Sequence, residues 1–158
     1  MRQKAMQPAR IRARRTEILH VEDNTAEAEL LRDALADFPE LTLRTLVDGV
    51  EALAYLRRPD AFVRAARPDL ILLDLDLPGL DGRRVLAELK ADPTLRAIPV
   101  IVLSGSTLEE DLALAYELGA NAYVVKPAQL NQFRAVVRAI CDFWCGAAAS
   151  PGRPAGNG

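Results

Sequence analysis

The sequence predicts an α/β fold in which five helices surround a doubly wound, five-stranded parallel sheet. From Glu17 onward, short runs of Ile, Val and Leu alternate with longer segments whose apolar residues recur at helical spacing. The runs at 70–73 and 100–103 are apolar at every position, as in central strands covered by helices on both faces. A chain of 158 residues, 50% of them apolar, is long enough for one such domain and short for two.

The order of the strands follows from this alternation. Right-handed crossovers between successive parallel strands give the order 2-1-3-4-5. Residues 57–68, between the second helix and the third strand, are expected to form a loop with a helical turn. We predict strands at 18–21, 41–46, 70–73, 100–103 and 122–125, and helices at 25–36, 49–56, 82–91, 108–118 and 129–144.

Several helix ends carry residues that suit them. Asn24 and Asp81 can cap the first and third helices, because their side-chain oxygens accept hydrogen bonds from unpaired backbone N–H groups. Ser106 or Thr107 can cap the fourth helix in the same way. Gly119 is expected to end that helix, since glycine adopts the left-handed conformation beyond a helix end at little cost.

The basic residues are unevenly distributed along the chain. The formal net charge is −2, yet six of the Lys and Arg residues lie within the first fifteen positions. We expect residues 1–15 to be a disordered basic arm, because a short charged run without apolar periodicity does not form a core. Residues 146–158, composed mainly of Ala, Gly, Pro and Ser, are expected to be a disordered tail. The folded domain would then span residues 16–145.

Other classes of protein are disfavoured by the composition. No apolar run reaches the length of a membrane span and the first residues lack a secretory pattern, so we expect a cytoplasmic protein. Cys141 and Cys145, with one histidine, are too few for a tetrahedral metal site and are expected to be reduced thiols. That histidine, His20, lies inside an apolar strand, which favours a packed imidazole over a phosphodonor.

Polar side chains collect where the predicted strands end. In an open parallel sheet, ligands bind at the carboxyl ends of the strands, near the point where the strand order reverses. The residues at these ends are carboxylates, one hydroxyl and one amine. They are Glu22, Asp23, Asp74, Asp76, Ser104 and Lys126.

This set of groups suits phosphoryl transfer assisted by Mg²⁺. Carboxylates close to one another repel unless a cation lies among them, and Mg²⁺ prefers oxygen ligands such as Asp23, Asp74 and a backbone carbonyl near Asp76. Glu22 could orient a water on the metal. The Lys126 ammonium and the Ser104 hydroxyl could stabilise phosphoryl oxygens while a carboxylate acts as the nucleophile.

Four segments resemble the motifs of bacterial response-regulator receiver domains and occur in the same order. They are VEDN at 21–24, LLDLDLPGLDG at 72–82, LSGS at 103–106 and VKP at 125–127. Ser104 lies 30 positions and Lys126 lies 52 positions after Asp74, as the resemblance requires. The resemblance covers about residues 17–144 and implies a flavodoxin-like fold.

The resemblance also implies a role for individual residues. Asp74 would be the phosphoacceptor, Glu22 and Asp23 the acids on the metal side, and Asp76 a metal ligand through its main-chain carbonyl. Lys126 would bind the phosphoryl group. Ser104 and Tyr123 would form the switch, and the Lys126–Pro127 peptide would be cis.

A narrower resemblance is to single-domain response regulators of phytochrome-type histidine kinases. It rests on residues 67–106 and on Cys-Asp-Phe-Trp at 141–144. It implies a sensor histidine kinase as partner, such as a bacteriophytochrome, and a homodimer through helix 4, strand 5 and helix 5. Phe143 and Trp144 would suit such an interface. No helix-turn-helix is expected after Trp144, which disfavours direct DNA binding.

Two alternative functions remain open at this point. A haloacid-dehalogenase-like phosphatase would use Asp74 as nucleophile and Asp76 as general acid. A phosphorylation-independent dimerisation module would keep the fold without using the acidic site. The chain also departs from the common receiver pattern, with Ser104 where threonine is usual and Asp76 where asparagine or methionine is usual, so the lifetime of an acyl phosphate is not determined.

Overall fold

Five parallel strands form one sheet in the computed structural model of the protein, which describes residues 15–58 and 67–148. The strand order is β2-β1-β3-β4-β5, which confirms the predicted fold class. The strands are β1 (Thr16–Val21), β2 (Leu41–Leu46), β3 (Leu70–Leu73), β4 (Val100–Ser104) and β5 (Ala122–Val125). The helices are α1 (Thr25–Leu35), α2 (Gly49–Leu56), α3 (Gly82–Ala91), α4 (Glu109–Glu117) and α5 (Leu130–Cys141), followed by the π-helical turn η2 (Asp142–Ala147).

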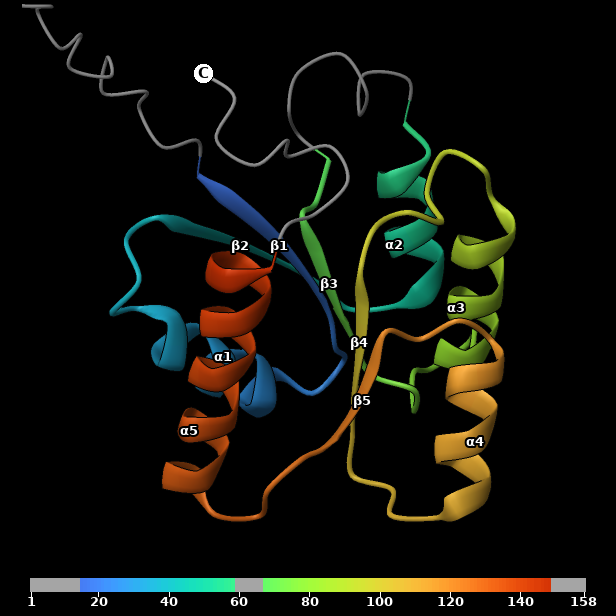
Figure 1. The fold of residues 1–158 in the computed structure, drawn as a ribbon. Coiled ribbons are helices and arrows are strands. Elements are labelled where there is room, and N and C mark those ends of the chain that lie inside the picture. The colour runs from blue at the N-terminus through green and yellow to red at the C-terminus, as the bar shows by residue number, and fades with distance from the viewer. Residues whose placement is uncertain (1–14, 59–66, 149–158) are drawn as a thin grey trace, which may run out of the picture.

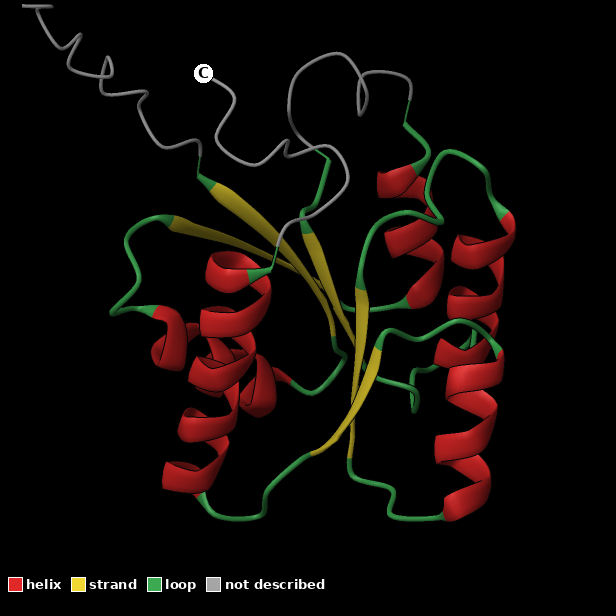
Figure 2. Cartoon of the chain, viewed as in Figure 1, coloured by secondary structure: helices red, strands yellow, loops and turns green. Residues whose placement is uncertain are grey.

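Helices cover both faces of the sheet. Helices α1 and α5 lie on one face, and α2, α3 and α4 lie on the other (Figure 1). The strands run between these two helical layers, and β3 and β4 have every residue buried (Figure 2). The continuous apolar runs of β3 and β4 therefore occupy the centre of the sheet, because both of their faces are covered.

The order of the strands reverses beside β1. This strand pairs with β2 on one side and β3 on the other, with Val21 in register with both Leu46 and Leu73. Because all five strands are parallel, their carboxyl ends meet along one edge of the sheet. Open α/β sheets bind ligands at the carboxyl ends of the strands where the strand order reverses, so a ligand site is expected at this edge.

Three of the predicted helix boundaries are confirmed. The Asn24 side chain caps α1 by accepting a hydrogen bond from the Glu27 backbone N–H at 3.1 Å. Asp81 caps α3 through the Arg83 N–H at 2.7 Å. Gly119 follows α4 with φ of 104°, a conformation that side chains other than glycine rarely adopt.

The predicted cap of α4 is wrong. This helix begins at Glu109, and its N-cap residue Leu108 has no side-chain oxygen to offer. The Ser106 hydroxyl accepts a hydrogen bond from the Leu108 N–H at 3.2 Å and donates one to Asp111 at 2.5 Å. Ser106 therefore organises the loop before the helix, because its hydroxyl lies too early in the chain to act as the cap.

Two predictions in the last third of the chain are also wrong. The Lys126–Pro127 peptide is trans, as are all peptide bonds of the described residues. The trans form of a proline peptide is favoured by about 0.5–1 kcal/mol, and here it is compatible with a Lys126 side chain that reaches the acidic edge. Helix α5 ends at Cys141, earlier than predicted, and residues 142–147 continue as the π-helical turn.

Two neighbouring aromatic residues of the π-helical turn η2 differ in their exposure to solvent. Trp144 packs against the apolar core on the α1/α5 side of the sheet, whereas 55% of Phe143 is exposed. Their rings meet edge to face, with centroids 5.2 Å apart. Cys141 and Cys145 are free thiols, and the hydrogen bond with Cys145 together with burial raises the pKa of Cys141.

Some sequence-based expectations fall outside the described residues. They are most of the basic arm at 1–15, most of the tail at 146–158 and the central part of the 57–68 loop. Within the described residues, no helix combines the length and apolarity needed to cross a bilayer.

Candidate functional site

The acidic edge of the sheet is held in place by backbone hydrogen bonds that continue past the strand ends. The Asp74 N–H donates to the Val21 carbonyl at 3.1 Å, and the Lys126 N–H donates to the Ser104 carbonyl at 2.8 Å. The first residue after each of these two strands is thus still part of the hydrogen-bonded ladder. The sheet therefore fixes the backbone of Asp74 and of Lys126, and with it the direction in which each side chain leaves the chain.

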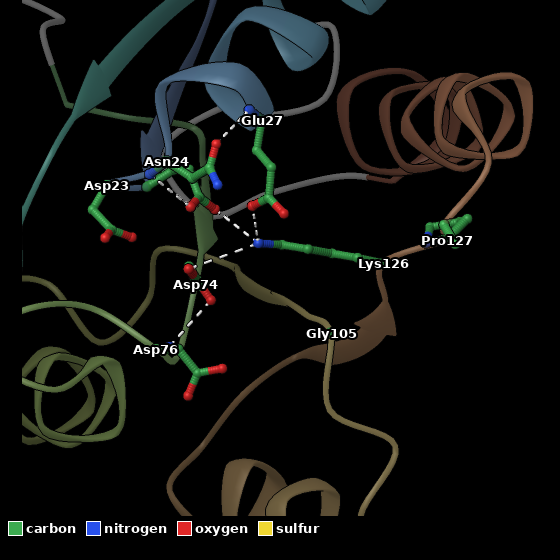
Figure 3. Close-up of a pocket in the computed structure, with 10 residues that line it drawn as sticks. Asp23, Asn24, Glu27, Asp74, Asp76, Gly105, Lys126 and Pro127 are labelled. Carbon is green, nitrogen blue, oxygen red and sulfur yellow. Dashed lines mark hydrogen bonds and ion pairs between the residues drawn. The ribbon is translucent and has the colours of Figure 1, made fainter.

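The Lys126 ammonium lies among three carboxylates. Its Nζ atom is 2.5 Å from Glu27 Oε2, 2.9 Å from Glu22 Oε2 and 3.7 Å from Asp74 Oδ2. Figure 3 shows the side chain extending from the end of β5 toward the Asp74 carboxylate, with Glu27 reaching down from α1. One ammonium therefore neutralises part of the charge of acids from β1, α1 and β3.

Burial makes the ionised forms of two of these acids costly. Glu22 is 2% exposed and Asp74 is 6% exposed. Burial raises the pKa of Glu22 to about 8, although the hydrogen bond from Lys126 opposes the shift. Burial likewise raises the pKa of Asp74, against the opposing charge of Lys126. For Lys126, burial lowers the pKa but the bonds to Glu27 and Glu22 outweigh it, so the net pKa is raised.

Asp23 and Asp76 lie at the rim of the same pocket and are exposed. The backbone N–H of Asp76 donates to Asp74 Oδ1 at 3.1 Å, which fixes the start of the loop after β3. In the view of Figure 3, Asp74 lies between the Asp23 carboxylate and the Lys126 ammonium. The site therefore has a side with acids alone and a side with the amine.

The pocket above Asp74 is open and polar. It has a volume of about 430 Å³ and is lined by Glu22, Asp23, Asn24, Glu27, Asp74, Asp76, Gly105, Lys126, Pro127 and Ala128. Carboxylate oxygens of Glu22, Glu27 and Asp74 lie within 4.8 Å of one another. These three carboxylates surround the Lys126 ammonium. The hard oxygen donors of the pocket as a whole, Asp23 and Asp74 among them, fit a divalent cation such as Mg²⁺ or Mn²⁺ and would not suit a soft metal.

Ser104 and Tyr123 lie behind this pocket. Ser104 is fully buried, and its hydroxyl accepts a hydrogen bond from the Ser106 N–H at 3.2 Å. Gly105, not Ser104, lines the pocket. Tyr123 is half-buried and its hydroxyl donates to the Ser106 carbonyl at 2.9 Å. The loop after β4 is thereby tied both to the strand it leaves and to β5.

His20 is packed inside the fold, as the sequence predicted. It is 2% exposed, and burial together with the charge of Lys126 lowers its pKa to about 3. The imidazole is therefore neutral at physiological pH and lies beneath the acidic edge.

Glu27 is the residue of this site that sequence reasoning missed. It lies four positions after Asp23 on the first turn of α1, three positions after the cap Asn24. An acidic residue at that position of a capped helix usually interacts with the helix terminus itself. Its position relative to the strand ends could have indicated the site, because a first-turn side chain of α1 borders the carboxyl edge.

Comparison with known proteins defines the family. The family model described as the response regulator receiver domain matches residues 18–138. The chain belongs to the response regulator receiver family, a class of phosphoacceptor signalling proteins. This membership rules out the haloacid-dehalogenase-like alternative as the family of the chain.

Individual relatives include regulators associated with phytochromes. The phosphorylated cyanobacterial phytochrome response regulator RcpA, known from a crystal structure, is 48% identical in sequence to this chain. The two structures match with a TM-score of 0.81, over 86% of this chain and 98% of that chain. Response regulator Rcp1 of Synechocystis sp. is 42% identical over 128 residues, covering 80% of this chain and 87% of Rcp1. The Mn²⁺-bound form of Rcp1 matches with a TM-score of 0.78 at 40% identity, covering 86% of this chain and 99% of that chain.

A relative whose name refers to a different process has a similar sequence identity to this chain. The "Probable methanogenesis regulatory protein FilR2" of Methanothrix harundinacea is 42% identical over 139 residues, covering 85% of this chain and 87% of that protein. Sequence identity at this level is thus shared by response regulators whose names refer to different processes. The chain is related to phytochrome response regulators.

Proposed function

We propose that Asp74 accepts a phosphoryl group from a sensor histidine kinase, with Mg²⁺ bound beside it, and that the transfer switches the surface formed by α4, β5 and α5. The observation that carries the proposal is the position of the Asp74 carboxylate. It directly follows the central strand β3, and its Oδ2 atom lies 3.7 Å from the Lys126 ammonium at an open pocket.

The chain's own residues provide most of what the transfer needs. The Asp74 carboxylate oxygen attacks phosphorus while the bond from phosphorus to the imidazole nitrogen of the kinase histidine breaks, and the Lys126 ammonium stabilises charge on the phosphoryl oxygens. Glu22, Asp23, Asp74 and the Asp76 main-chain carbonyl are the proposed residues around the metal, with Glu22 orienting a water. When bound, Mg²⁺ would neutralise further charge on the transferred group. The Mn²⁺-bound form of the relative Rcp1 supports a divalent cation at this edge.

The proposed switch is the loop that joins β4 to α4. The Ser104 hydroxyl accepts from the Ser106 N–H and is fully buried outside the pocket lining, so it has to move toward the pocket to donate to a phosphoryl oxygen. Moving Ser104 displaces Ser106, whose carbonyl accepts the hydrogen bond from Tyr123. The loop and the tyrosine therefore move together, and a phosphoryl group that bonds Ser104 favours one arrangement of both.

The partners of the chain are also proposals. A phytochrome-type histidine kinase, such as a bacteriophytochrome, is the proposed kinase, and the phytochrome response regulator RcpA supports this proposal. A homodimer through α4, β5 and α5 is supported by apolar side chains that this surface exposes, namely Leu112, Tyr116, Val125 and Leu130. Phe143 is exposed and could extend the contact, whereas Trp144 packs on the core. The cytoplasmic location and the absence of DNA binding remain predictions.

Substitution of the phosphoacceptor tests the function directly. The wild-type protein is incubated with acetyl phosphate and Mg²⁺, and the phosphorylated fraction is measured on a gel that retards phosphoproteins. We expect Asp74→Asn to reduce this fraction to background, because an amide is not a nucleophile toward phosphorus. The control is Asp33→Asn, an exposed position on α1. Phosphorylation of Asp74→Asn at the wild-type level would refute the assignment, and an unreactive wild-type protein would favour the phosphorylation-independent module.

A further inference from the structure

We infer that Glu27 is a positioning residue that holds the Lys126 ammonium away from Asp74 until a phosphoryl group arrives. The inference rests on the proposed function and adds a residue to it. In this structure the lysine is closer to Glu27, at 2.5 Å, than to Asp74, at 3.7 Å. The ammonium that would stabilise the transferred group is thus bound elsewhere before the reaction.

The contact is built by the fold. The backbone of Glu27 is fixed by the hydrogen bond from its N–H to the Asn24 side chain at 3.1 Å. Its side chain extends down from α1 to the Lys126 ammonium, which reaches the same point from the end of β5 (Figure 3). The lysine side chain is 12% exposed and the glutamate side chain 36% exposed. The pair is therefore partly desolvated, which strengthens it relative to a fully exposed ion pair.

Glu22 and Glu27 together offer Lys126 two carboxylates at hydrogen-bond distance. Both carboxylates line the pocket, but the Glu22 side chain is only 1% exposed whereas the Glu27 side chain is 36% exposed, so water can replace Lys126 more easily at Glu27. If Lys126 moves toward a phosphoryl oxygen, the bond to Glu27 is the one that opens to water. The cost of opening it opposes phosphorylation, so Glu27 lowers the rate and favours the unphosphorylated state.

The test uses Glu27→Gln in the full chain. The rate of phosphorylation by subsaturating acetyl phosphate with saturating Mg²⁺ is expected to rise roughly two- to fivefold, the size expected from loss of one partly exposed ion pair. The affinity for beryllofluoride, a mimic of the phosphoryl group, is expected to rise by a similar factor. In a crystal structure of the metal-free variant, we expect Lys126 Nζ to lie closer to Asp74 than in the wild-type protein.

Two further variants separate this role from a general effect of charge. Glu29→Gln removes the same charge from an exposed position of the same helix, and its rate is expected to equal that of the wild type. Glu27→Asp keeps the charge but shortens the reach toward Lys126, so its rate is expected to rise as in Glu27→Gln. Equal rate increases in Glu27→Gln and Glu29→Gln, or a wild-type rate in Glu27→Asp, would show that charge alone matters and would overturn the inference.

Metal binding provides a readout that is independent of the reaction. Mg²⁺ affinity, measured by titration without a phosphodonor, is expected to change less than twofold in Glu27→Gln, whereas loss of a carboxylate ligand costs roughly tenfold or more. A tenfold loss would make Glu27 a metal ligand and would overturn the inference. An unreactive wild type would reject the proposed function itself. A wild type that reacts through Asp74, with Glu27→Gln unchanged in rate, would reject only the role of Glu27.

Discussion

The two edges of the sheet use polar side chains in opposite ways. At the amino edge, polar groups complete hydrogen bonds of the strands, since the Asn121 side chain accepts from the Val100 N–H at 2.9 Å and Asp69 accepts from the Glu17 N–H at 2.8 Å. At the carboxyl edge, Glu22 and Asp74 are buried acids that share one amine. The hydrogen bonds named at the amino edge are satisfied by neighbouring groups, whereas at the carboxyl edge three acids surround a single ammonium.

This difference suggests that polar side chains at the amino edge serve mainly the stability of the sheet, whereas those at the carboxyl edge have the features of a functional site. A buried hydrogen bond that is satisfied contributes to stability, whereas buried acids with raised pKa values are typical of functional sites. Binding of a cation or a phosphoryl group is therefore expected to stabilise the carboxyl edge, and no such effect is expected at the amino edge. The backbone of the carboxyl edge is nevertheless packed as tightly as the core, because α3 starts directly against the end of β3.

The largest effect on stability is expected from Gly82→Ala. A Cβ atom at Gly82 would lie 2.2 Å from the Asp74 carbonyl oxygen and 2.6 Å from the Leu75 Cα, and backbone atoms cannot move aside cheaply. We expect the free energy of unfolding to fall by about 2–3 kcal/mol, measured by urea denaturation. Gly105→Ala is the control, since a Cβ atom there would have no neighbouring atom within 4 Å and little change is expected. Equal effects of both would contradict the tight approach of α3.

A smaller loss is expected at the amino edge from Asn121→Ala. This change leaves the N–H of the fully buried Val100 without its acceptor and removes a bond from the Lys90 ammonium at 3.1 Å. We expect the free energy of unfolding to fall by about 2 kcal/mol. Asn131→Ala, at an exposed position of α5, should change it by less than about 0.5 kcal/mol. A neutral Asn121→Ala would remove the contrast between the two edges.

The smallest of these effects is a pH dependence at the carboxyl edge. The pKa of Glu22 is about 8 in the folded protein against 4.5 ordinarily, so between these pH values the folded protein keeps a proton that the unfolded chain has released. The contribution of Glu22 to the free energy of unfolding is therefore fully present below pH 4.5 and is lost as the pH rises through 8. The full shift corresponds to roughly 5 kcal/mol, but an ionised Glu22 can turn toward the water of the open pocket, so we expect a difference of about 1–2 kcal/mol between wild type and Glu22→Gln to develop over this window.

Denaturation at several pH values without added metal measures this dependence. Saturating Mg²⁺ should reduce it, because a bound cation favours the ionised carboxylate. The exposed Glu29→Gln should keep the wild-type pH profile. A Glu22→Gln variant with the same profile as the wild type would mean that burial does not hold a proton on Glu22.

Most of the fold could be predicted from local sequence. The runs at 70–73 and 100–103 are strands because every residue is apolar and both faces are covered, and the alternation of strands and helices limits the topology to few possibilities. The caps Asn24 and Asp81 were predictable because each bonds a backbone group two or three residues away. The set of polar strand ends was predictable for a similar reason, since parallel strands bring their carboxyl ends to one edge.

Contacts between distant parts of the chain were decided only by the tertiary structure. Ser106 bonds Asp111 instead of capping α4, and Lys126 bonds Glu27 across 99 positions of sequence. These choices depend on where a side chain of one element meets another, and a single hydrogen bond contributes only about 0.5–1.5 kcal/mol to either alternative. Sequence thus determined which elements form and which edge is acidic, whereas the position of Glu27 on α1, within reach of Lys126, was determined only by the tertiary structure.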